Sequence, residues 1–386
     1  MSILTNDGEI KYAKGLEGVI AAISSISFID GGKGILVYRG HSIETLAKHS
    51  NFEEVAYLLI YGELPTKTQL DIFSNTLKDY RTIDQLLTVI KSFPLDAHPM
   101  DVIRSTISLL GIYCPDRFDF SKEVKIQKVL RVIAKLPTIV AAYSRLREGL
   151  EPISPDPSLG HAENFLYMLN GKKPDPLHSK ILDINLILHA DHGMNASTFS
   201  SMVTISTLSD VYSSITSGIG TLKGPLHGGA NERVLKMLDE IGDPANVKQW
   251  LDDTMEERKK IMGFGHRVYT AYDPRAKILK KYAKQLGENN KGSKYFQIGE
   301  KVEKYMIAKV GDKGIQPNVD FYSGIVFNHM GIKTDLFTPI FAISRSSGWG
   351  AHLLEYLEAN RLFRPRAIYN GPLHAEYIKI EEREGE

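Results

Sequence analysis

Apolar residues recur at helical spacing through most of this chain, after a short extended start. Residues 26–29 and 35–38 are apolar runs of strand length. The glycine-rich stretch 30–34 between them supplies turn residues, so the pattern predicts a β-hairpin. Apolar residues in 52–59 then fall on one face of a helix, and Gly62 follows as a stop signal.

Helix-start signals mark several later segments. Thr66 and Gln69 have the spacing of a capping box. Asp273 and Pro274 place a cap residue before a proline at the first helical position, and we expect that helix to end at Gly287. Further helices are predicted at 100–113, at 125–147 and from Thr338-Pro339 onwards. The sequence therefore predicts a mainly α protein with one short amino-terminal β-hairpin.

The bulk composition is that of a soluble globular protein. At 386 residues the chain can bury a large core, and we expect two domains. A formal net charge of +1 gives no reason to expect nucleic acid or a membrane as a partner. Cys114 is the only cysteine, which excludes an intramolecular disulfide and fits a reducing compartment. The first residues lack the features of a signal peptide, so we expect a cytoplasmic protein.

Reactive polar side chains stand in glycine-rich or apolar settings at five places. The segments are His-Ala-Asp-His at 189–192, Gly-Pro-Leu-His-Gly-Gly-Ala-Asn at 224–231, Gly-Phe-Gly-His-Arg at 263–267, Tyr-Asp-Pro-Arg at 272–275 and Pro-Asn-Val-Asp at 317–320. Histidines, an arginine and an aspartate in such settings predict one site that is assembled from separate elements.

The first histidines each have a structural alternative to a chemical role. His189 and His192 are three residues apart and would face one side of a helix, which suits two metal ligands. A zinc site needs a third ligand, so a pair of hydrogen-bonded core histidines is the alternative. His227 precedes a helix that should end near Ile241, where free N–H groups favour a neutral ring. Such a ring can donate to a developing enolate oxygen; the alternative is a turn histidine.

Two later residues also permit two interpretations. His266 follows Gly263 and Gly265, and glycines allow the backbone to approach a ligand closely. Asp320 precedes the apolar run 321–327. It either caps a helix or, beside an apolar wall, has a raised pKa and serves as a base.

Basic residues in unfavourable settings indicate bound anions. Arg275 lies in the first turn of its helix, where the dipole disfavours a cation, so a carboxylate partner is expected. Arg345 lies among apolar residues within a helix and should be paired or hold a ligand. Arg364, beside Pro365, is ambiguous. The run Arg258-Lys259-Lys260 is either a solvated face or a site for a phosphorylated ligand.

The combination of motifs resembles the citrate synthase family over nearly the full length of the chain. Gly-Pro-Leu-His-Gly-Gly-Ala-Asn, Gly-Phe-Gly-His-Arg-Val-Tyr and Pro-Asn-Val-Asp-Phe-Tyr-Ser-Gly occur in the order of that family. So do His-Ala-Asp-His, Tyr-Asp-Pro-Arg-Ala, Arg345-Ser-Ser-Gly-Trp and Arg364-Pro-Arg. The resemblance implies a mostly helical homodimer with shared active sites. It implies a large domain at 1–222 and 331–386, and a smaller domain at 223–330 that closes over the substrates.

The resemblance also implies a reaction. Acetyl-CoA would condense with oxaloacetate through an enol or enolate, and citryl-CoA would then be hydrolysed to citrate and CoA. By motif position, Asp320 would remove a methyl proton and His227 would donate to the enolate oxygen. His266 would polarise the oxaloacetate carbonyl and act as the acid. No metal and no redox cofactor is expected, since CoA enters as the substrate thioester.

Motif positions further imply the binding residues. His192, Arg275 and Arg345 would hold oxaloacetate or citrate, and Arg364 would do so from the neighbouring subunit. Two carboxylates call for several arginines with bidentate geometry, which agrees with this set. Lys313 matches a CoA-phosphate position loosely, and the basic run 258–260 is the other candidate for binding CoA. The chain starts close to the expected catalytic core, so we expect no amino-terminal regulatory domain.

Three alternatives stay open. A 2-methylcitrate synthase would use propionyl-CoA with the same motifs, and one methylene changes discrimination by only about 1–3 kcal/mol. A histidine-based metallohydrolase is a second class of enzyme. A non-catalytic helical binding protein is the third, although it would have no need for Asp320, His227 and His266 together.

Overall fold

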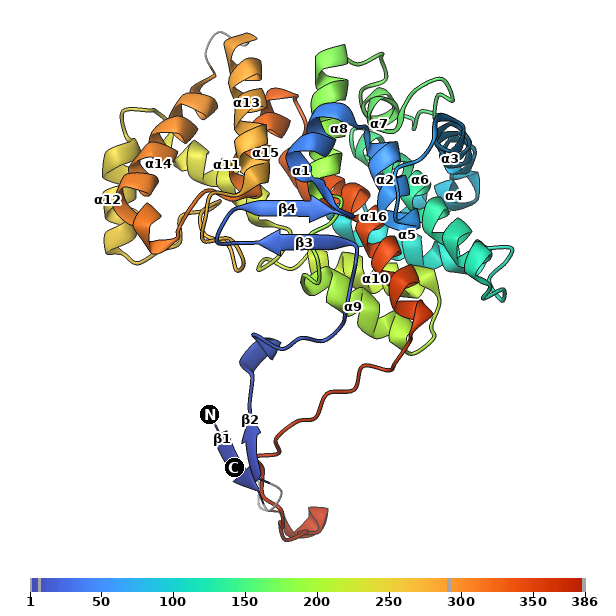
Figure 1. The fold of residues 1–386 in the computed structure, drawn as a ribbon, viewed down its shortest axis with the longest axis vertical. Coiled ribbons are helices and arrows are strands. Elements are labelled where there is room, and N and C mark those ends of the chain that lie inside the picture. The colour runs from blue at the N-terminus through green and yellow to red at the C-terminus, as the bar shows by residue number, and fades with distance from the viewer. Residues whose placement is uncertain (1, 6–7, 290–292, 384–386) are drawn as a thin grey trace.

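The computed structural model describes residues 2–5, 8–289 and 293–383. Within these ranges the chain forms sixteen α-helices and five short strands (Figure 1). The strands are β1 (Ser2–Thr5), β2 (Gly8–Lys11), β3 (Ser27–Asp30), β4 (Ile35–Tyr38) and β5 (His41–Ser42). The helices are α1 (Ile43–His49), α2 (Phe52–Tyr61), α3 (Lys67–Tyr80), α4 (Asp84–Ser92), α5 (Pro99–Tyr113), α6 (Lys122–Arg147), α7 (His161–Asn170), α8 (Pro176–His189), α9 (Ala196–Ser206), α10 (Val211–Leu222), α11 (Ala230–Ile241), α12 (Val247–Glu256), α13 (Pro274–Asn289), α14 (Lys294–Val310), α15 (Val319–His329) and α16 (Phe337–Glu358).

The predicted fold class is confirmed, as are the signals for the first hairpin and for α2 and α3. Strands β3 and β4 pair antiparallel as the expected hairpin, and β5 adds a short third strand. Helix α2 ends where Gly62 caps it, and α3 begins with the complete capping box of Thr66 and Gln69. A second hairpin, β1–β2, was not predicted from the sequence.

One predicted helix boundary is wrong. Helix α13 starts at Pro274 as expected but continues past Gly287 to Asn289. A side chain at position 287 would lie 3.4 Å from the Phe296 Cβ atom and 3.6 Å from the His329 ring. The glycine therefore lets α14 and α15 pack against α13, which is a packing role and not a stop signal.

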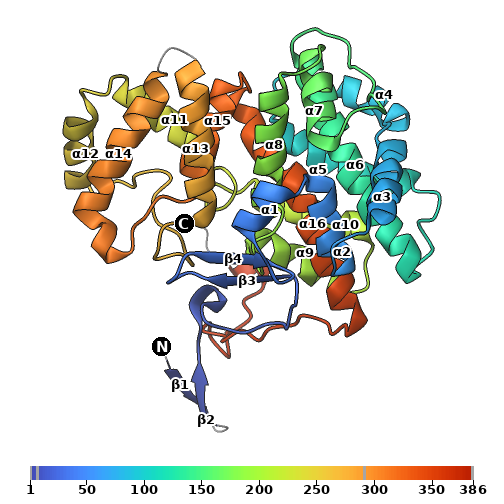
Figure 2. The ribbon, with the colours of Figure 1, turned by 45° about the horizontal axis from the view of Figure 1, so that its top comes forward.

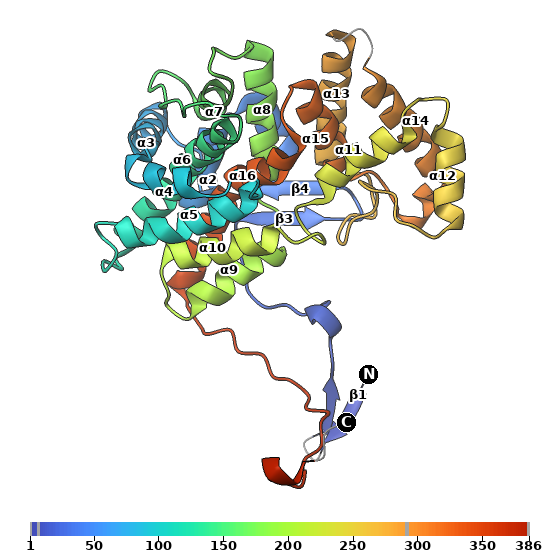
Figure 3. The same cartoon turned by 180° about the vertical axis from the view of Figure 1, so that it is seen from behind.

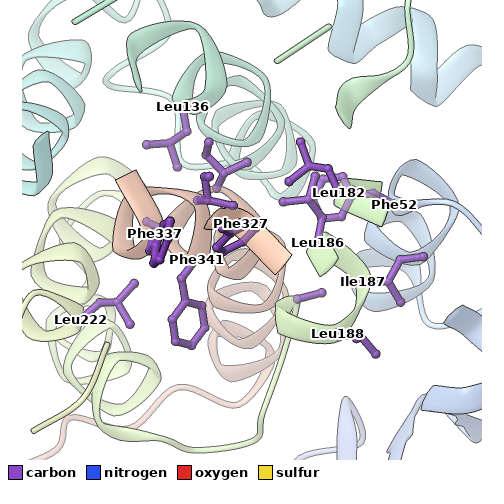
Figure 4. Packing of buried hydrophobic residues seen from close by; sticks show 14 of the residues in the cluster. Phe52, Leu136, Leu182, Leu186, Ile187, Leu188, Leu222, Phe327, Phe337 and Phe341 are labelled. Carbon is purple, nitrogen blue, oxygen red and sulfur yellow. The ribbon is translucent and has the colours of Figure 1, made fainter. Parts of the chain in front are cut away.

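Helix α16 is the central element of the fold. Every residue from Phe337 to Leu354 is buried, and α16 packs against α2, α6, α8, α9 and α10. Figure 4 shows Phe337 and Phe341 within this core. A helix surrounded on all sides can carry a polar residue only where that residue is paired or functional, so Arg345 in its middle needs an explanation.

Helices α11–α15 gather on one side of the molecule, and α2–α10 with α16 lie on the other (Figures 1 and 2). The domain boundaries at 222/223 and 330/331 stay a prediction. The β1–β2 hairpin and the segment after α16 extend away from the helices (Figure 3). None of the helices in the described ranges has both the length and the apolar character that crossing a membrane requires.

Candidate active site

Two loops that are distant in sequence meet through their aromatic rings. The His192 ring lies with its centroid 5.1 Å from that of His266 and 5.4 Å from that of Tyr269. The Nε2 atom of His192 is 3.3 Å from the Tyr269 hydroxyl. The His-Ala-Asp-His motif and the Gly-Phe-Gly-His-Arg motif therefore form one site, as the sequence predicted.

The prediction that His189 and His192 share a helix face is wrong, because α8 ends at His189. The Tyr38 hydroxyl donates to the Asp191 carbonyl at 2.7 Å and accepts from the Asp191 N–H at 3.1 Å, which holds this backbone outside the helix. The ring of His189 instead bonds to the Asn185 carbonyl at 2.9 Å. Among the described residues, no group of three or more His, Cys, Asp or Glu is arranged to hold a metal ion.

The loop that carries His266 is fastened to the start of α15. Gly263 has a φ of +79°, and a side chain there would lie 2.7 Å from Phe321. Its carbonyl accepts from the Asn318 N–H at 2.9 Å, and the Gly265 N–H donates to the Gln316 carbonyl at 2.9 Å. Only glycine combines this backbone conformation with this close approach. The histidine loop and the segment before Asp320 are consequently held side by side.

Backbone donors fix the tautomer of His266. Its Nδ1 atom accepts from the N–H groups of Val268 at 3.0 Å and Tyr269 at 3.3 Å. Burial, reinforced by the charge of Arg275, lowers the pKa of His266 to about 4. The ring is therefore neutral near pH 7 and carries its proton on Nε2, which is the donor available to a ligand.

His227 has the opposite tautomer. The Ser197 N–H donates to its Nε2 atom at 3.3 Å, and the Ser197 hydroxyl lies 2.8 Å from the same atom. That hydroxyl also accepts from the Trp349 Nε1–H at 3.1 Å and lies 2.7 Å from Asn195 Oδ1. Burial lowers the pKa of His227 to about 4. A neutral His227 therefore offers Nδ1–H as its free donor.

Asp320 is not the cap of its helix. Asn318 caps α15, and its side chain accepts from the Asp320 N–H at 3.0 Å. The Oδ1 atom of Asp320 is buried and has no hydrogen-bond partner within the described chain. Burial raises the pKa of Asp320 to about 7, against the opposing charges of Arg275 and Arg345. A buried carboxylate with a free oxygen and a pKa near neutrality suits a general base.

The anion expected beside Arg275 is Asp273. Arg275 donates from Nε and an Nη atom to the two carboxylate oxygens of Asp273, at 3.0 and 2.8 Å. The same carboxylate accepts from the Val319 N–H at 3.1 Å. Sequence reasoning identified Asp273 only as a helix cap. An aspartate two residues before a first-turn arginine was the available signal for the ion pair.

Arg345 is buried, and none of the described residues gives it a carboxylate partner. Its Nε–H donates to the His189 carbonyl at 2.8 Å, and its guanidinium stacks over the Phe341 ring with 4.7 Å to the centroid. An Nη atom has no hydrogen-bond partner among the described residues. Burial lowers the pKa of Arg345 to about 10, so it is still charged at pH 7. A buried cation with a free donor costs stability, which an anionic ligand would reduce.

An open cavity of about 640 Å³ connects the two histidines to the basic run. His227, His266 and Asn318 line it, together with Arg258, Lys259 and Lys260. Lys259 pairs with Glu257 at 2.6 Å. Lys313, the looser candidate, is exposed at the end of a 3₁₀ turn and is not among the lining residues.

Arg364 lies apart from the other candidates. It is exposed, in the extended segment that follows α16 (Figure 3). The structure therefore brings together His192, Arg275, Arg345, His266, His227 and Asp320, but not Arg364.

Asp320→Asn should raise the melting temperature most at high pH. The folded-state pKa of Asp320, about 7, lies above the unfolded value of about 4. The protonated form is thus favoured on folding, and this stabilising contribution is lost as the pH rises through about 7. Asparagine does not titrate. Melting curves should show the largest gain at about pH 8 and a smaller one at about pH 5. A variant that melts lower at about pH 8 would mean that the carboxylate has a stabilising partner.

Known proteins resemble the chain over nearly its whole length. The family profile described as "Citrate synthase, C-terminal domain" matches residues 15–366. The citrate synthase of Synechocystis sp. is 48% identical over 385 residues, covering 99% of this chain and 96% of the relative. The 2-methylcitrate synthase 1 of Corynebacterium glutamicum is 42% identical and covers 98% and 100%.

Solved structures agree in fold. The citrate synthase of Pyrobaculum aerophilum has a TM-score of 0.93 at 45% identity, with 99% of this chain and 98% of that chain covered. A ternary complex of carboxymethyl coenzyme A and oxaloacetate with the citrate synthase of Thermoplasma acidophilum has a TM-score of 0.92 at 38% identity, with 97% and 100% covered. This chain belongs to the citrate synthase family.

Proposed function

We propose that this protein condenses acetyl-CoA with oxaloacetate and hydrolyses the resulting citryl-CoA to citrate and CoA. The observation that carries the proposal is the free, buried Oδ1 atom of Asp320, on a carboxyl group whose pKa burial raises to about 7. A base of this kind is matched to removing a proton from a weak carbon acid near neutral pH. The relatives named citrate synthase support the same reaction.

Enolisation is the first step. Asp320 takes a proton from the acetyl methyl group while negative charge develops on the thioester oxygen. A carboxylate alone is too weak for this, so a fixed donor must stabilise the oxygen. His227 supplies that donor from Nδ1, because Ser197 occupies its Nε2 atom. Because the ring is neutral, His227 donates a hydrogen bond to the thioester oxygen and keeps its proton.

Condensation is the second step. The enol carbon attacks the oxaloacetate carbonyl, whose oxygen receives a hydrogen bond and then the proton of His266 Nε2. The ring regains a proton from the water that enters for hydrolysis, which leaves that water as the hydroxide that attacks the thioester. His192, Arg275 and Arg345 hold the substrate carboxylates. The unpartnered Nη atom of Arg345 supports this role, whereas Asp273 already holds one edge of Arg275. Water then hydrolyses citryl-CoA.

The CoA portion of the substrate fits the cavity lined by Arg258, Lys259 and Lys260, since phosphate groups need clustered cations. Lys313 stays a weaker candidate.

No metal ion or redox cofactor takes part in the proposed chemistry. Closure of the smaller domain and a cytoplasmic location stay predictions.

A 2-methylcitrate synthase is the second candidate, because one relative with that name is 42% identical over nearly the whole chain. The two reactions differ by one methylene in the acyl group, which a pocket discriminates by about 1–3 kcal/mol. Comparing kcat/KM for acetyl-CoA and propionyl-CoA separates them. A larger value for propionyl-CoA would replace the first assignment.

Purified protein should release free CoA from acetyl-CoA only when oxaloacetate is present. Asp320→Asn should lower this rate by about 10²–10⁴-fold, because it removes the general base. Oxaloacetate binding, measured by calorimetry, should stay nearly unchanged. A thiol-release assay gives the rates. Equal release with and without oxaloacetate would identify a simple thioesterase and contradict the proposal.

Activity should fall about tenfold per pH unit below about pH 7, because only ionised Asp320 can accept the proton. The pKa values of His227 and His266, lowered to about 4, place their ionisation well below this limb. The measurement is kcat/KM against pH with both substrates far below saturation. An acid limb near the ordinary carboxylate pKa of about 4 would mean that Asp320 is not the base.

A homodimer with shared active sites is also proposed. Arg364 is exposed and lies outside the site of its own chain, on an extended segment that carries exposed apolar residues. Apolar side chains in such a segment favour cover by a partner. A second copy would bring Arg364 to a substrate carboxylate, where an arginine fork binds well.

Mixing inactive variants tests the shared site. Arg364→Ala and Asp320→Asn homodimers should each be nearly inactive. In a mixed dimer one site carries both lesions and the other neither, so up to about half of the wild-type activity should return if the sites are independent.

The matched control for this experiment mixes Asp320→Asn with His227→Ala. Both of those lesions belong to the subunit's own site, so each site of the mixed dimer keeps one lesion and no activity should return. If verified Arg364→Ala mixtures are equally inactive, Arg364 serves its own subunit.

A further inference from the structure

A buried glutamate lies behind the site and contacts neither cavity-lining histidine. Glu303 on α14 is only 3% exposed. Three donors converge on its carboxylate: the Tyr272 hydroxyl at 2.5 Å, the Lys280 ammonium at 2.5 Å and the Tyr322 hydroxyl. A buried charge persists only when it is paired and hydrogen-bonded in this way.

The three donors come from different segments. Lys280 lies on α13 and Tyr322 on α15, whereas Tyr272 precedes α13 in the chain. Glu303 therefore joins α13, α14, α15 and the loop before α13 at one point. Burial raises the pKa of both tyrosines, so both hydroxyls keep their protons and act as donors at any working pH.

Both tyrosines stand next to residues of the site. Tyr322 is two residues after Asp320 in the first turns of α15. Tyr272 immediately precedes Asp273, whose carboxylate holds Arg275 and also accepts the Val319 N–H. The segments 272–275 and 318–322 thus have two connections, one through Asp273 at the site and one through Glu303 behind it.

We propose that Glu303 is a positioning residue that sets the separation between Asp320 and Arg275. The Asp273 contact holds the first residue of α15 beside Arg275, and α13 and α15 pack against each other. The tyrosine contacts to Glu303 add a second polar link behind the site, which fixes how this packed pair is seated and hence where the Asp320 side chain points. The inference rests on the proposed function, because it gives Asp320 the role of base and Arg275 that of anion holder.

The two tyrosine contacts to Glu303 should affect different constants, one kcat and the other the oxaloacetate dissociation constant. Tyr322→Phe removes one of the contacts that position the end of α15 that carries Asp320, so kcat should fall roughly tenfold while the oxaloacetate dissociation constant changes less than about twofold. A misplacement of about 1 Å can cost up to about 10²-fold in rate. Tyr272→Phe loosens the segment that holds Arg275, so the oxaloacetate dissociation constant should rise severalfold, by more than kcat falls.

Tyr305→Phe is the matched control. Tyr305 also lies on α14, and its hydroxyl also bonds to a carboxylate, that of Asp252 on α12. It touches neither site segment, so its loss should leave both constants within about twofold of the wild type. Glu303→Gln, which keeps the shape but loses the charge, should show both effects together.

The experiment measures kcat by CoA release and oxaloacetate binding by calorimetry, on variants whose circular dichroism matches the wild type. The proposal is supported if Tyr322→Phe mainly lowers kcat and Tyr272→Phe mainly raises the oxaloacetate dissociation constant. Proportional loss of both constants in both variants, or values equal to those of Tyr305→Phe, overturns it. A wild-type protein that releases no CoA would instead reject the proposed function, so the two failures are distinguishable.

Discussion

The carboxylate of Asp273 is the contact on which the arrangement of the site depends. It accepts two hydrogen bonds from the guanidinium of Arg275, one from the Arg275 N–H and one from the backbone of α15. The two partners act on Asp320 in opposite directions, since the charge of Arg275 lowers its pKa and the charge of Asp273 raises it. An arginine without this carboxylate would lower the pKa of Asp320 further and make it a weaker base near neutral pH. Asp273 therefore allows a cation to stand beside the site while offsetting its effect on the base.

The two histidines illustrate a second constraint, in which the backbone decides which ring nitrogen is free. N–H groups of the chain occupy Nδ1 of His266 and Nε2 of His227, so the rings offer opposite atoms to a ligand. Burial keeps both rings neutral. Two neutral donors can polarise two different carbonyl oxygens, whereas imidazolium rings beside Arg275 and Arg345 would concentrate positive charge in a buried space.

The sequence predicted elements with strong local signals and missed those that tertiary contacts decide. The β3–β4 hairpin and the α3 capping box follow from turn and cap residues alone. The end of α8 at His189 does not, because the Tyr38 hydroxyl, distant in sequence, holds the next residues. Motifs identified the residues that share the site, but not the contacts that orient them. The Asp273–Arg275 pair and the Glu303 cluster depend on helix placement, which no local spacing records.

Unsatisfied groups explain why so much apolar packing surrounds this site. Asp320 Oδ1 and an Nη atom of Arg345 are buried without partners among the described residues, and each such group costs stability in the empty protein. The apolar length of α16, buried from Phe337 to Leu354, supplies stabilisation that offsets this cost while holding Arg345 in place. A substrate carboxylate that accepts a hydrogen bond from this Nη atom removes part of that loss of stability, and the gain contributes to the binding free energy. The free oxygen of Asp320 must stay unsatisfied until the reacting proton arrives, so its cost is inherent in a base of this kind.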